Sequence, residues 1–137
     1  MRSFHRLLIR ADAAMRKTVL GGAAAVGLSS GQPKLLEYLY ICGDADQKTI
    51  AANSGIEAAT AGTVLFGMEE KGLIWRKRSE NDKRSIIVGL TDKGRAAAEC
   101  AVKVFADADK KALDGMNEKE TEKLCLMLEK ICANLGC

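Results

Sequence analysis

The sequence predicts a mainly α-helical protein with one small β-hairpin, and three observations support this fold class. Apolar residues recur at helical spacing near both ends of the 137-residue chain. In the middle, two helical segments are separated by the turn "SGI" at 54–56. The segment "RKRSENDKRSIIVGL" follows, in which two strand-like stretches flank a polar turn.

The first half of the chain contains three expected helices. The first extends from Ser3 to Val26, and glycines weaken its end. Ser29 or Ser30 is the expected N-cap of the second helix, which contains Pro33 at an early position and stops at a glycine. A short third helix covers "QKTIAAN", because the preceding Asp46 is a good N-cap residue.

The second half begins with a fourth helix from Glu57 to about Lys71, which a following glycine stops. The strands of the hairpin are "LIWRKR" and "RSIIVGL". Thr91 caps a long helix that reaches about Ala112, with a narrow apolar stripe that includes a cysteine, Cys100. The capping-box pattern "NEKE" at 117–120 then opens a last amphipathic helix.

The charge distribution is more informative than the composition. Apolar residues make up 47% and charged residues 28% of the chain, and the formal net charge is +3. Between Trp75 and Arg84, five bases oppose two acids, so this short hairpin segment carries as much net positive charge as the whole chain. A cluster of this kind is expected to meet a polyanion such as the phosphates of nucleic acid.

Several classes of protein are disfavoured by what the sequence lacks. It has no apolar stretch long enough to span a membrane and no typical signal peptide, so a cytoplasmic protein is expected, with its five cysteines as thiols. One histidine, no CxxC motif, no Gly-rich phosphate loop and no catalytic triad argue against a metal centre, a cofactor and an enzyme.

A short helix, a turn, a second helix and a basic hairpin together form the pattern of a winged helix-turn-helix lobe. In such a lobe the second helix enters the major groove of DNA, and the hairpin is the wing that contacts the backbone or the neighbouring groove. Asp82 at the tip is expected to shape the wing, by pairing with a nearby guanidinium or with amides of the turn.

The chain resembles the MarR family of transcriptional regulators. The resemblance is carried by "GLSSGQPKLLEYL", "QKTIAANSGI" and "MEEKGLIWRKRSENDKRSIIVGLTDKG", and above all by Asp82-x-Arg84 followed by Leu90-Thr91-x-x-Gly94. It implies a homodimer that binds a pseudo-palindromic operator on double-stranded DNA, often as a repressor. It also implies release by a small-molecule effector or an oxidant.

Three parts of the chain are expected. Residues 1–27 form an N-terminal dimerisation helix, residues 28–91 the winged helix-turn-helix DNA-binding lobe, and residues 92–137 the C-terminal dimerisation helices. The apolar faces of the terminal helices support a dimer independently of the resemblance, because the small lobe cannot cover them. The alternative is a monomeric bundle in which both ends pack on the lobe.

The DNA contacts are expected from the recognition helix 57–71 and the wing 75–90. Thr60 and Thr63 share a helix face, where hydroxyls can reach bases or phosphates and methyls can touch thymine. Arg84 is the candidate for insertion into a groove, and Glu57 can cap its helix or pair with Arg84 to set the wing angle. The phosphate candidates are Lys48, Arg76, Lys77, Arg78 and Lys83.

The recognition helix departs from the family pattern, since no arginine is available for guanine. Specificity then depends on the wing and on DNA shape, or the lobe has become a protein-contact module. A cysteine-based oxidant sensor is a further alternative, although packing explains the cysteines as well, with Cys125 and Cys132 on one apolar helix face. An effector cleft lined by Met15, Tyr38, Cys42 and Trp75 also competes with an ordinary core.

Overall fold

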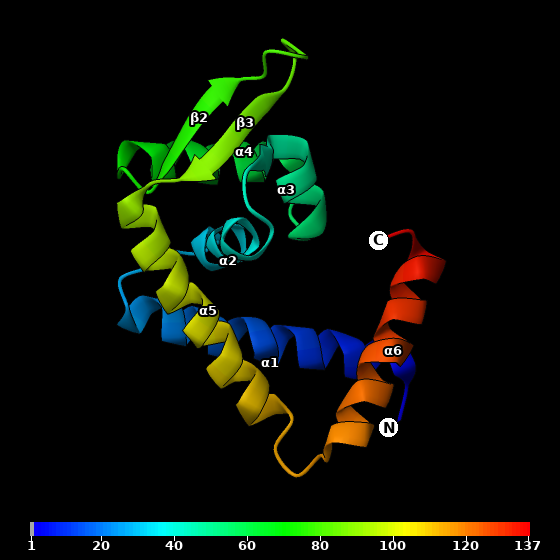
Figure 1. The fold of residues 1–137 in the computed structure, drawn as a ribbon. Coiled ribbons are helices and arrows are strands. Elements are labelled where there is room, and N and C mark those ends of the chain that lie inside the picture. The colour runs from blue at the N-terminus through cyan, green and yellow to red at the C-terminus, as the bar shows by residue number, and fades with distance from the viewer. Residues whose placement is uncertain (1) are drawn as a thin grey trace.

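A computed structural model describes residues 2–137 and confirms the predicted fold class, a mainly helical chain with a small antiparallel β-wing (Figure 1). In chain order the elements are α1 (Phe4–Ala25), α2 (Gln32–Cys42), β1 (Ala45–Asp46), α3 (Gln47–Asn53), α4 (Ala58–Glu70), β2 (Ile74–Arg78), β3 (Ile86–Leu90), α5 (Asp92–Ala112) and α6 (Glu118–Leu135).

The sheet contains one strand that the sequence pattern did not predict. The strand order is β1-β3-β2 and both pairings are antiparallel, so β3 is the central strand. In the hairpin, Arg76 of β2 lies opposite Val88 of β3, and Ala45 of β1 lies on the other side of Val88. A two-residue strand has no periodicity of its own, because its pairing comes from a neighbour more than 40 residues away along the chain.

The core of the lobe lies where α2, α3, α4 and β3 meet. Its members are spaced at three and four residues along the helices, which puts them on one face of each. Burying such aliphatic side chains is the main stabilising contribution, at about 1.5–3 kcal/mol each. The largest fully buried side chains are Leu35, Leu36, Ile50, Leu65, Met68 and Val88.

Most of the predicted helix caps are confirmed. The side chains of Asp46, Thr91 and Asn117 each accept a hydrogen bond from a backbone amide three residues later, and Asn117 forms a complete capping box with Glu120. The predicted serine cap of α2 is wrong, because Gly31, with φ +84°, is the N-cap. A Cβ at Gly31 would also lie 3.2 Å from the side chain of Val64, so the chain has a glycine where α2 approaches α4.

The long helices extend away from the lobe. α5 begins beside the hairpin, and its C-terminal half crosses α1, as Figure 1 shows. Val19 of α1 with Val104 and Ala108 of α5 forms a small second core. Within residues 2–137, no helix is both long enough and apolar enough to cross a membrane.

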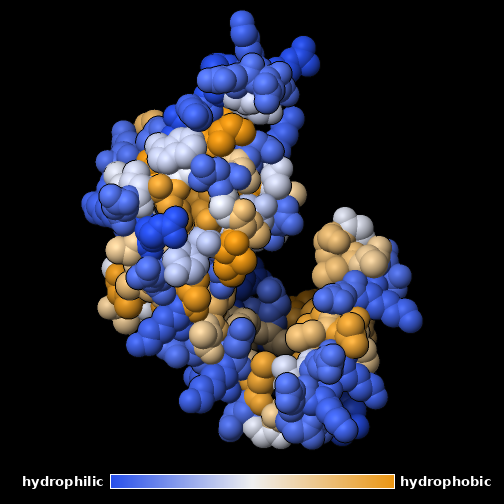
Figure 2. All heavy atoms as spheres, in the orientation of Figure 1, coloured by the Kyte–Doolittle hydropathy of each residue, from blue (hydrophilic) through white to orange (hydrophobic). Residues whose placement is uncertain are grey.

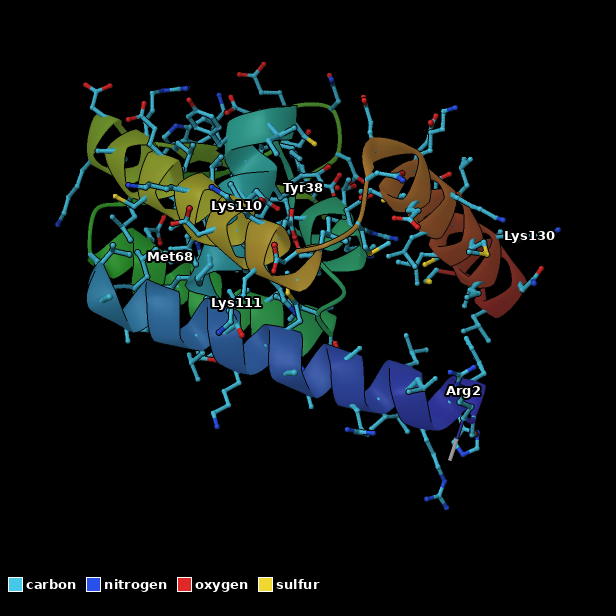
Figure 3. The ribbon with its side chains drawn as sticks, turned by 90° about the horizontal axis from the view of Figure 1, so that it is seen from below. Arg2, Tyr38, Met68, Lys110, Lys111 and Lys130 are labelled. Carbon is cyan, nitrogen blue, oxygen red and sulfur yellow. The ribbon has the colours of Figure 1, made fainter. Side chains whose placement is uncertain are left out.

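α6 stands apart from the rest of the chain in Figures 1 and 3. None of residues 118–135 is buried by the other described residues, although the helix carries many apolar side chains. Leu126 is 58% exposed and Leu135 is 72% exposed. The monomeric bundle considered above is therefore not the fold of the single chain. Cys125 and Cys132 of this helix are exposed, and so is Cys100 in the predicted apolar stripe of α5.

One backbone contact joins the wing and α4 to α5. A Cβ placed on Gly94 would lie 1.6 Å from the carbonyl oxygen of Leu73, so only glycine allows this approach. Around it, the Thr91 amide donates to the Leu73 carbonyl oxygen (3.1 Å), and the Thr91 hydroxyl donates to the carbonyl oxygen of Gly72. We call this set of contacts, made by residues 72–73 with residues 91–94, the junction.

The substitution Gly94→Ala is expected to destabilise the protein by at least about 2 kcal/mol, because the new methyl group meets backbone that cannot rotate away. Urea unfolding at a fixed protein concentration measures this change. The control is Gly62→Ala in α4, where nothing lies within 4 Å of the added Cβ among the described atoms. Replacing this helical glycine is expected to stabilise by up to about 1 kcal/mol. Equal effects of the two substitutions would contradict the junction.

Candidate nucleic-acid interface

The two helices of the helix-turn-helix are fixed by local hydrogen bonds. Asp46 ends β1 and caps α3, with one carboxylate oxygen accepting from the Thr49 amide (2.9 Å) and the other from the Thr49 hydroxyl (2.7 Å). These bonds hold the pKa of Asp46 below its ordinary value. Gly55, at φ +63°, makes the turn, and the Ile56 amide donates to the Ala51 carbonyl oxygen (3.0 Å). The short strand, the first helix and the turn therefore place α4 relative to the sheet.

The exposed side of α4 is mostly small and apolar. Ala61, Leu65 and Met68 are buried, so the opposite side of the helix faces outward. Thr60 and Thr63 are both exposed, as predicted for groove contacts. Their surroundings differ, because Thr60 and Val64 line a cleft. The Thr63 hydroxyl donates to the Ala59 carbonyl oxygen (3.2 Å). Thr63 does not line this cleft and is the more freely presented of the two to a partner.

The tip of the wing is a compact turn built around Asp82. One carboxylate oxygen of Asp82 accepts from the Arg84 amide (3.0 Å), and the other accepts from the Ser85 hydroxyl (3.3 Å). The Ser79 hydroxyl accepts from the amides of Asn81 and Asp82, at 3.3 Å each. Of the two roles expected for Asp82, the structure shows binding to the turn, through one backbone amide and one hydroxyl. This arrangement leaves the guanidinium of Arg84 out of the carboxylate's hydrogen bonds.

Four of the five wing bases are exposed and lie toward the tip, where the blue surface at the top of Figure 2 shows the hydrophilic character of the hairpin. The Arg78 guanidinium donates to the carbonyl oxygen of Lys83 (2.8 Å) and closes the turn across the two strands. The ammonium of Lys77 lies 5.4 Å from the centre of the Trp75 ring. Lys48, in the first turn of α3, is also exposed. The exposed bases are Lys77, Arg78, Lys83 and Arg84.

Arg76 differs from the other wing bases because its guanidinium is hydrogen-bonded to side chains of α3 and α4. Its Nε and Nη2 donate to one carboxylate oxygen of Glu69 (3.3 and 3.1 Å), and its Nη1 donates to Gln47 (2.9 Å). The guanidinium also lies 5.9 Å from the centre of the Phe66 ring. Arg76, predicted as a phosphate contact, thus links β2 to α3 and α4 and is only 19% exposed.

Glu57 lies at the start of α4, where a negative charge interacts favourably with the helix dipole. It is the N-cap residue of α4, but its side chain makes no cap hydrogen bond. Among residues 2–137 the structure also shows no ion pair between Glu57 and Arg84. The wing angle is instead supported by Arg76, Glu69 and Gln47. Neither Glu69 nor Gln47 was predicted in this role. The only signal in the sequence was that both are hydrogen-bond acceptors on helices expected to lie near the basic strand.

The residues suggested for an effector cleft do not come together. A cleft of about 600 Å³ lies between α1 and the lobe, with Met15 and Val19 of α1 and Val64 of α4 in its wall. Tyr38 and Cys42 line a different hollow, and Trp75 packs over Gly89 in the hairpin. The spacing of these residues indicated that they face inward. It could not indicate which pairs of helices leave a cleft between them.

The surroundings of one of the five cysteines disfavour its reactive thiolate form. All five are exposed, and at the end of α6 a hydrogen bond with the Cys137 thiol raises the pKa of Cys132. A raised pKa decreases the fraction of thiolate, which is the form that reacts with oxidants.

Replacing the cap of α3 is expected to destabilise the lobe in a pH-dependent way. Asp46→Ala should cost about 1 kcal/mol at neutral pH. The pKa of Asp46 is lowered by folding, so this stability is present above the carboxylate's ordinary pKa of 3.8 and is lost as the pH falls below it. Asp46→Asn, which keeps an acceptor without a charge, should retain most of the stability at both pH values. Thermal unfolding at neutral and acid pH measures both variants, and an Asp46→Ala loss that persists unchanged in acid would contradict this account of the cap.

Comparisons with known proteins agree with this geometry. The model of the MarR family matches residues 28–86. The transcriptional regulator BilQ of Clostridium symbiosum is 30% identical over 105 residues, which cover 77% of this chain and 73% of BilQ. The uncharacterized regulator YwaE of Bacillus subtilis is 31% identical over 101 residues, and the match spans 59% of YwaE.

Solved structures show the same fold. The MepR–DNA complex of Staphylococcus aureus has a TM-score of 0.85 at 23% identity, covering 98% of this chain and 99% of that one. A mutant of Escherichia coli MarR in complex with operator DNA has a TM-score of 0.80 at 20% identity, covering 93% and 91%. With the motifs, the wing and the similarity to BilQ, these findings show that the chain belongs to the MarR family of DNA-binding transcriptional regulators, which are not enzymes.

Proposed function

We propose that two copies of this chain form a homodimer that represses transcription by binding a pseudo-palindromic operator. In each copy, recognition helix 57–71 lies in the major groove and wing 75–90 contacts the adjacent backbone and minor groove. The single observation that carries the proposal is the row of exposed bases on the wing, directly beside the outward face of α4. An ordered turn with so much positive charge fits a polyanionic partner.

The expected DNA contacts differ among the predicted residues. Lys77, Lys83 and Arg78 are exposed and meet phosphates, while Arg84 is the candidate for insertion into the minor groove. Lys48 is positioned to contact a phosphate at the start of α3. Arg76 supports the base of the wing, because three of its five N–H groups are bound to Glu69 and Gln47.

The dimer is supported by apolar surface that the single chain leaves uncovered. In α1, Phe4 is 60% exposed and Ile9 is 64% exposed, and α6 has no buried residue among those described. In Figure 2 the orange surface near α6 faces inward, across the gap toward the lobe, while the outer side is blue. Exposed apolar faces of this size on two long helices fit a second copy of the same chain.

The proposal includes release by a small ligand, with the cleft between α1 and the lobe as the candidate site. Val64 and Thr60 of α4 contribute to its wall together with Met15 and Leu20 of α1. An occupant would therefore touch the recognition helix and the dimerisation helix at once. Such a contact allows binding to change the position of the lobe relative to α1.

The relatives support this assignment through what their own names state. Rv2887 of Mycobacterium tuberculosis is a transcriptional repressor, 28% identical over 125 residues that cover 91% of this chain and 90% of Rv2887. MepR and the MarR mutant were both solved with DNA.

The competing function is a winged-helix module that contacts another protein. The exposed Phe66 on α4 favours this alternative, because an aromatic side chain is 53% exposed where many DNA-binding helices carry polar groups. Random duplex DNA separates the two functions. A DNA-binding protein binds it with strong salt dependence, and a protein-contact module does not bind it even at low salt.

Arg84→Ala is expected to weaken binding to duplex DNA, because one phosphate-neutralising charge is lost from the wing. The slope of log K against log salt should fall by about one. Fluorescence anisotropy over a salt series measures both quantities. The matched control is Lys110→Ala, which removes one charge from the far end of α5, labelled in Figure 3. An unchanged slope for Arg84→Ala would place the wing away from DNA.

Leu128→Glu is expected to dissociate the dimer. Leu128 of α6 is exposed in the single chain, so a carboxylate there costs no core packing but would be buried between two copies. Sedimentation should give twice the 14.7 kDa of one chain for the parent and a single chain for the variant. Lys130→Glu, at a polar position of the same helix, serves as the control and should leave the dimer intact. A parent protein that sediments as one chain at micromolar concentration contradicts the proposal.

A further inference from the structure

The outward face of α4 has a stripe that is apolar over most of its length. Ala59, Thr63, Phe66 and Glu70 are separated by four, three and four residues, which places them in one line along the helix. All four are exposed. We call the first three the methyl stripe, because Ala59 and Thr63 each present a methyl group and Phe66 presents an aromatic ring. Glu70 follows at the C-terminal end of the helix.

The polar groups nearest to the methyl stripe are already hydrogen-bonded within the lobe. The Thr63 hydroxyl donates its proton to the Ala59 carbonyl oxygen. The guanidinium of Arg76, which lies over the Phe66 ring, donates to Glu69 and Gln47 through three of its nitrogens. Helix α4 itself, residues 58–70, contains no lysine or arginine. The Thr63 proton and three of the five N–H groups of Arg76 are therefore already in use, which leaves this face few donors for the acceptors of a guanine.

The residues beside the methyl stripe leave room for a close approach. Gly62 and Gly67 flank Thr63 and Phe66, and apart from the adjacent residues and the backbone of the same helix, no described atom lies within 4 Å of a Cβ built on either glycine. The glycines do not relieve crowding inside the lobe, and each lowers helix stability relative to alanine. Their effect is to lower the helix surface on both sides of the stripe. The stripe can then reach the floor of a groove about 12 Å wide.

The exposed bases near this face indicate that its occupant is DNA. Lys77, Arg78, Lys83 and Arg84 project from the wing, and Lys48 begins the neighbouring helix. A purely apolar protein partner would leave these charges without counterions, whereas phosphates on both sides of a groove would neutralise them. Within the major groove, the 5-methyl group of thymine is the apolar feature that alanine, threonine methyl and phenylalanine contact.

We propose that the methyl stripe selects thymine through its 5-methyl group, so that the base pairs beneath α4 in each half-site are T·A rather than G·C. The proposal rests on the proposed function, since it requires α4 to lie in the major groove. Thr63 contributes specificity through its methyl group and not its hydroxyl. Ala59 and Phe66 extend the same contact by about one helical turn in each direction.

The test begins with selection of bound sites from a random pool of duplex DNA by the purified full-length protein. Single thymines of the selected half-site are then replaced by deoxyuridine, which pairs identically but lacks the methyl group. Each replacement beneath α4 should weaken binding about four-fold, the factor for uncovering one methyl-sized apolar group. Replacements outside the α4 contact should have no effect. The ratio between thymine and deoxyuridine sites should stay constant as salt is raised, while both affinities fall.

Two substitutions at Thr63 provide matched controls. Thr63→Ser keeps the hydroxyl and removes the methyl group, so the preference for thymine over deoxyuridine at one position should disappear. Thr63→Val keeps the branched methyl and removes the hydroxyl, so the preference should remain. Both replacements keep the side chain small and exposed, and circular dichroism verifies that the helix content is unchanged.

The outcomes separate this inference from the proposed function. Selection of G·C-rich half-sites with equal affinity for thymine and deoxyuridine overturns the methyl stripe while leaving an operator-binding dimer in place. Loss of the thymine preference in Thr63→Val but not in Thr63→Ser assigns the contact to the hydroxyl and also overturns it. Failure to bind any duplex at low salt overturns the proposed function itself.

Discussion

The contact between the start of α5 and the turn after α4 is the constraint on which the rest of the structure depends. At the junction, Gly94 lies so close to the Leu73 carbonyl oxygen that a side chain is excluded, and Thr91 hydrogen-bonds to the same turn. α4, both wing strands and the long α5 all end or begin at or next to these few residues. A rigid connection at this point gives the lobe a defined orientation relative to the long helices α5 and α1.

The proposed interface consists of two chemically different surfaces. The wing carries exposed positive charge on a turn held by Asp82 and Ser79, whereas α4 presents methyl groups and one aromatic ring. Charge supplies affinity that salt weakens, and the apolar contact supplies discrimination that salt leaves unchanged. Arg76 joins the two surfaces, because its bonds to Glu69 and Gln47 keep the base of the wing against both helices.

Local signals predicted most of the fold, and long-range contacts account for the errors. Asp46, Thr91 and Asn117 were identified as caps because a cap depends on residues a few positions away. Strand β1, the glycine cap of α2 and the internal pairing of Arg76 were not predicted, because each depends on a partner distant in sequence. Composition located the basic wing correctly, but it could not show which of the five bases the protein uses for its own packing.

The length of α5 has a mechanical consequence. Its 21 residues extend about 31 Å from the junction to the end that lies against α1. A tilt of about 5° at that end moves the opposite end by nearly 3 Å, close to the 3.4 Å rise of a single base-pair step. In the proposed dimer both arms would swing together, so the gap between the two copies of α4 would change by up to twice that amount. Repacking of the small side chains where α1 crosses α5 would then be amplified into a mismatch with the helical repeat of the duplex.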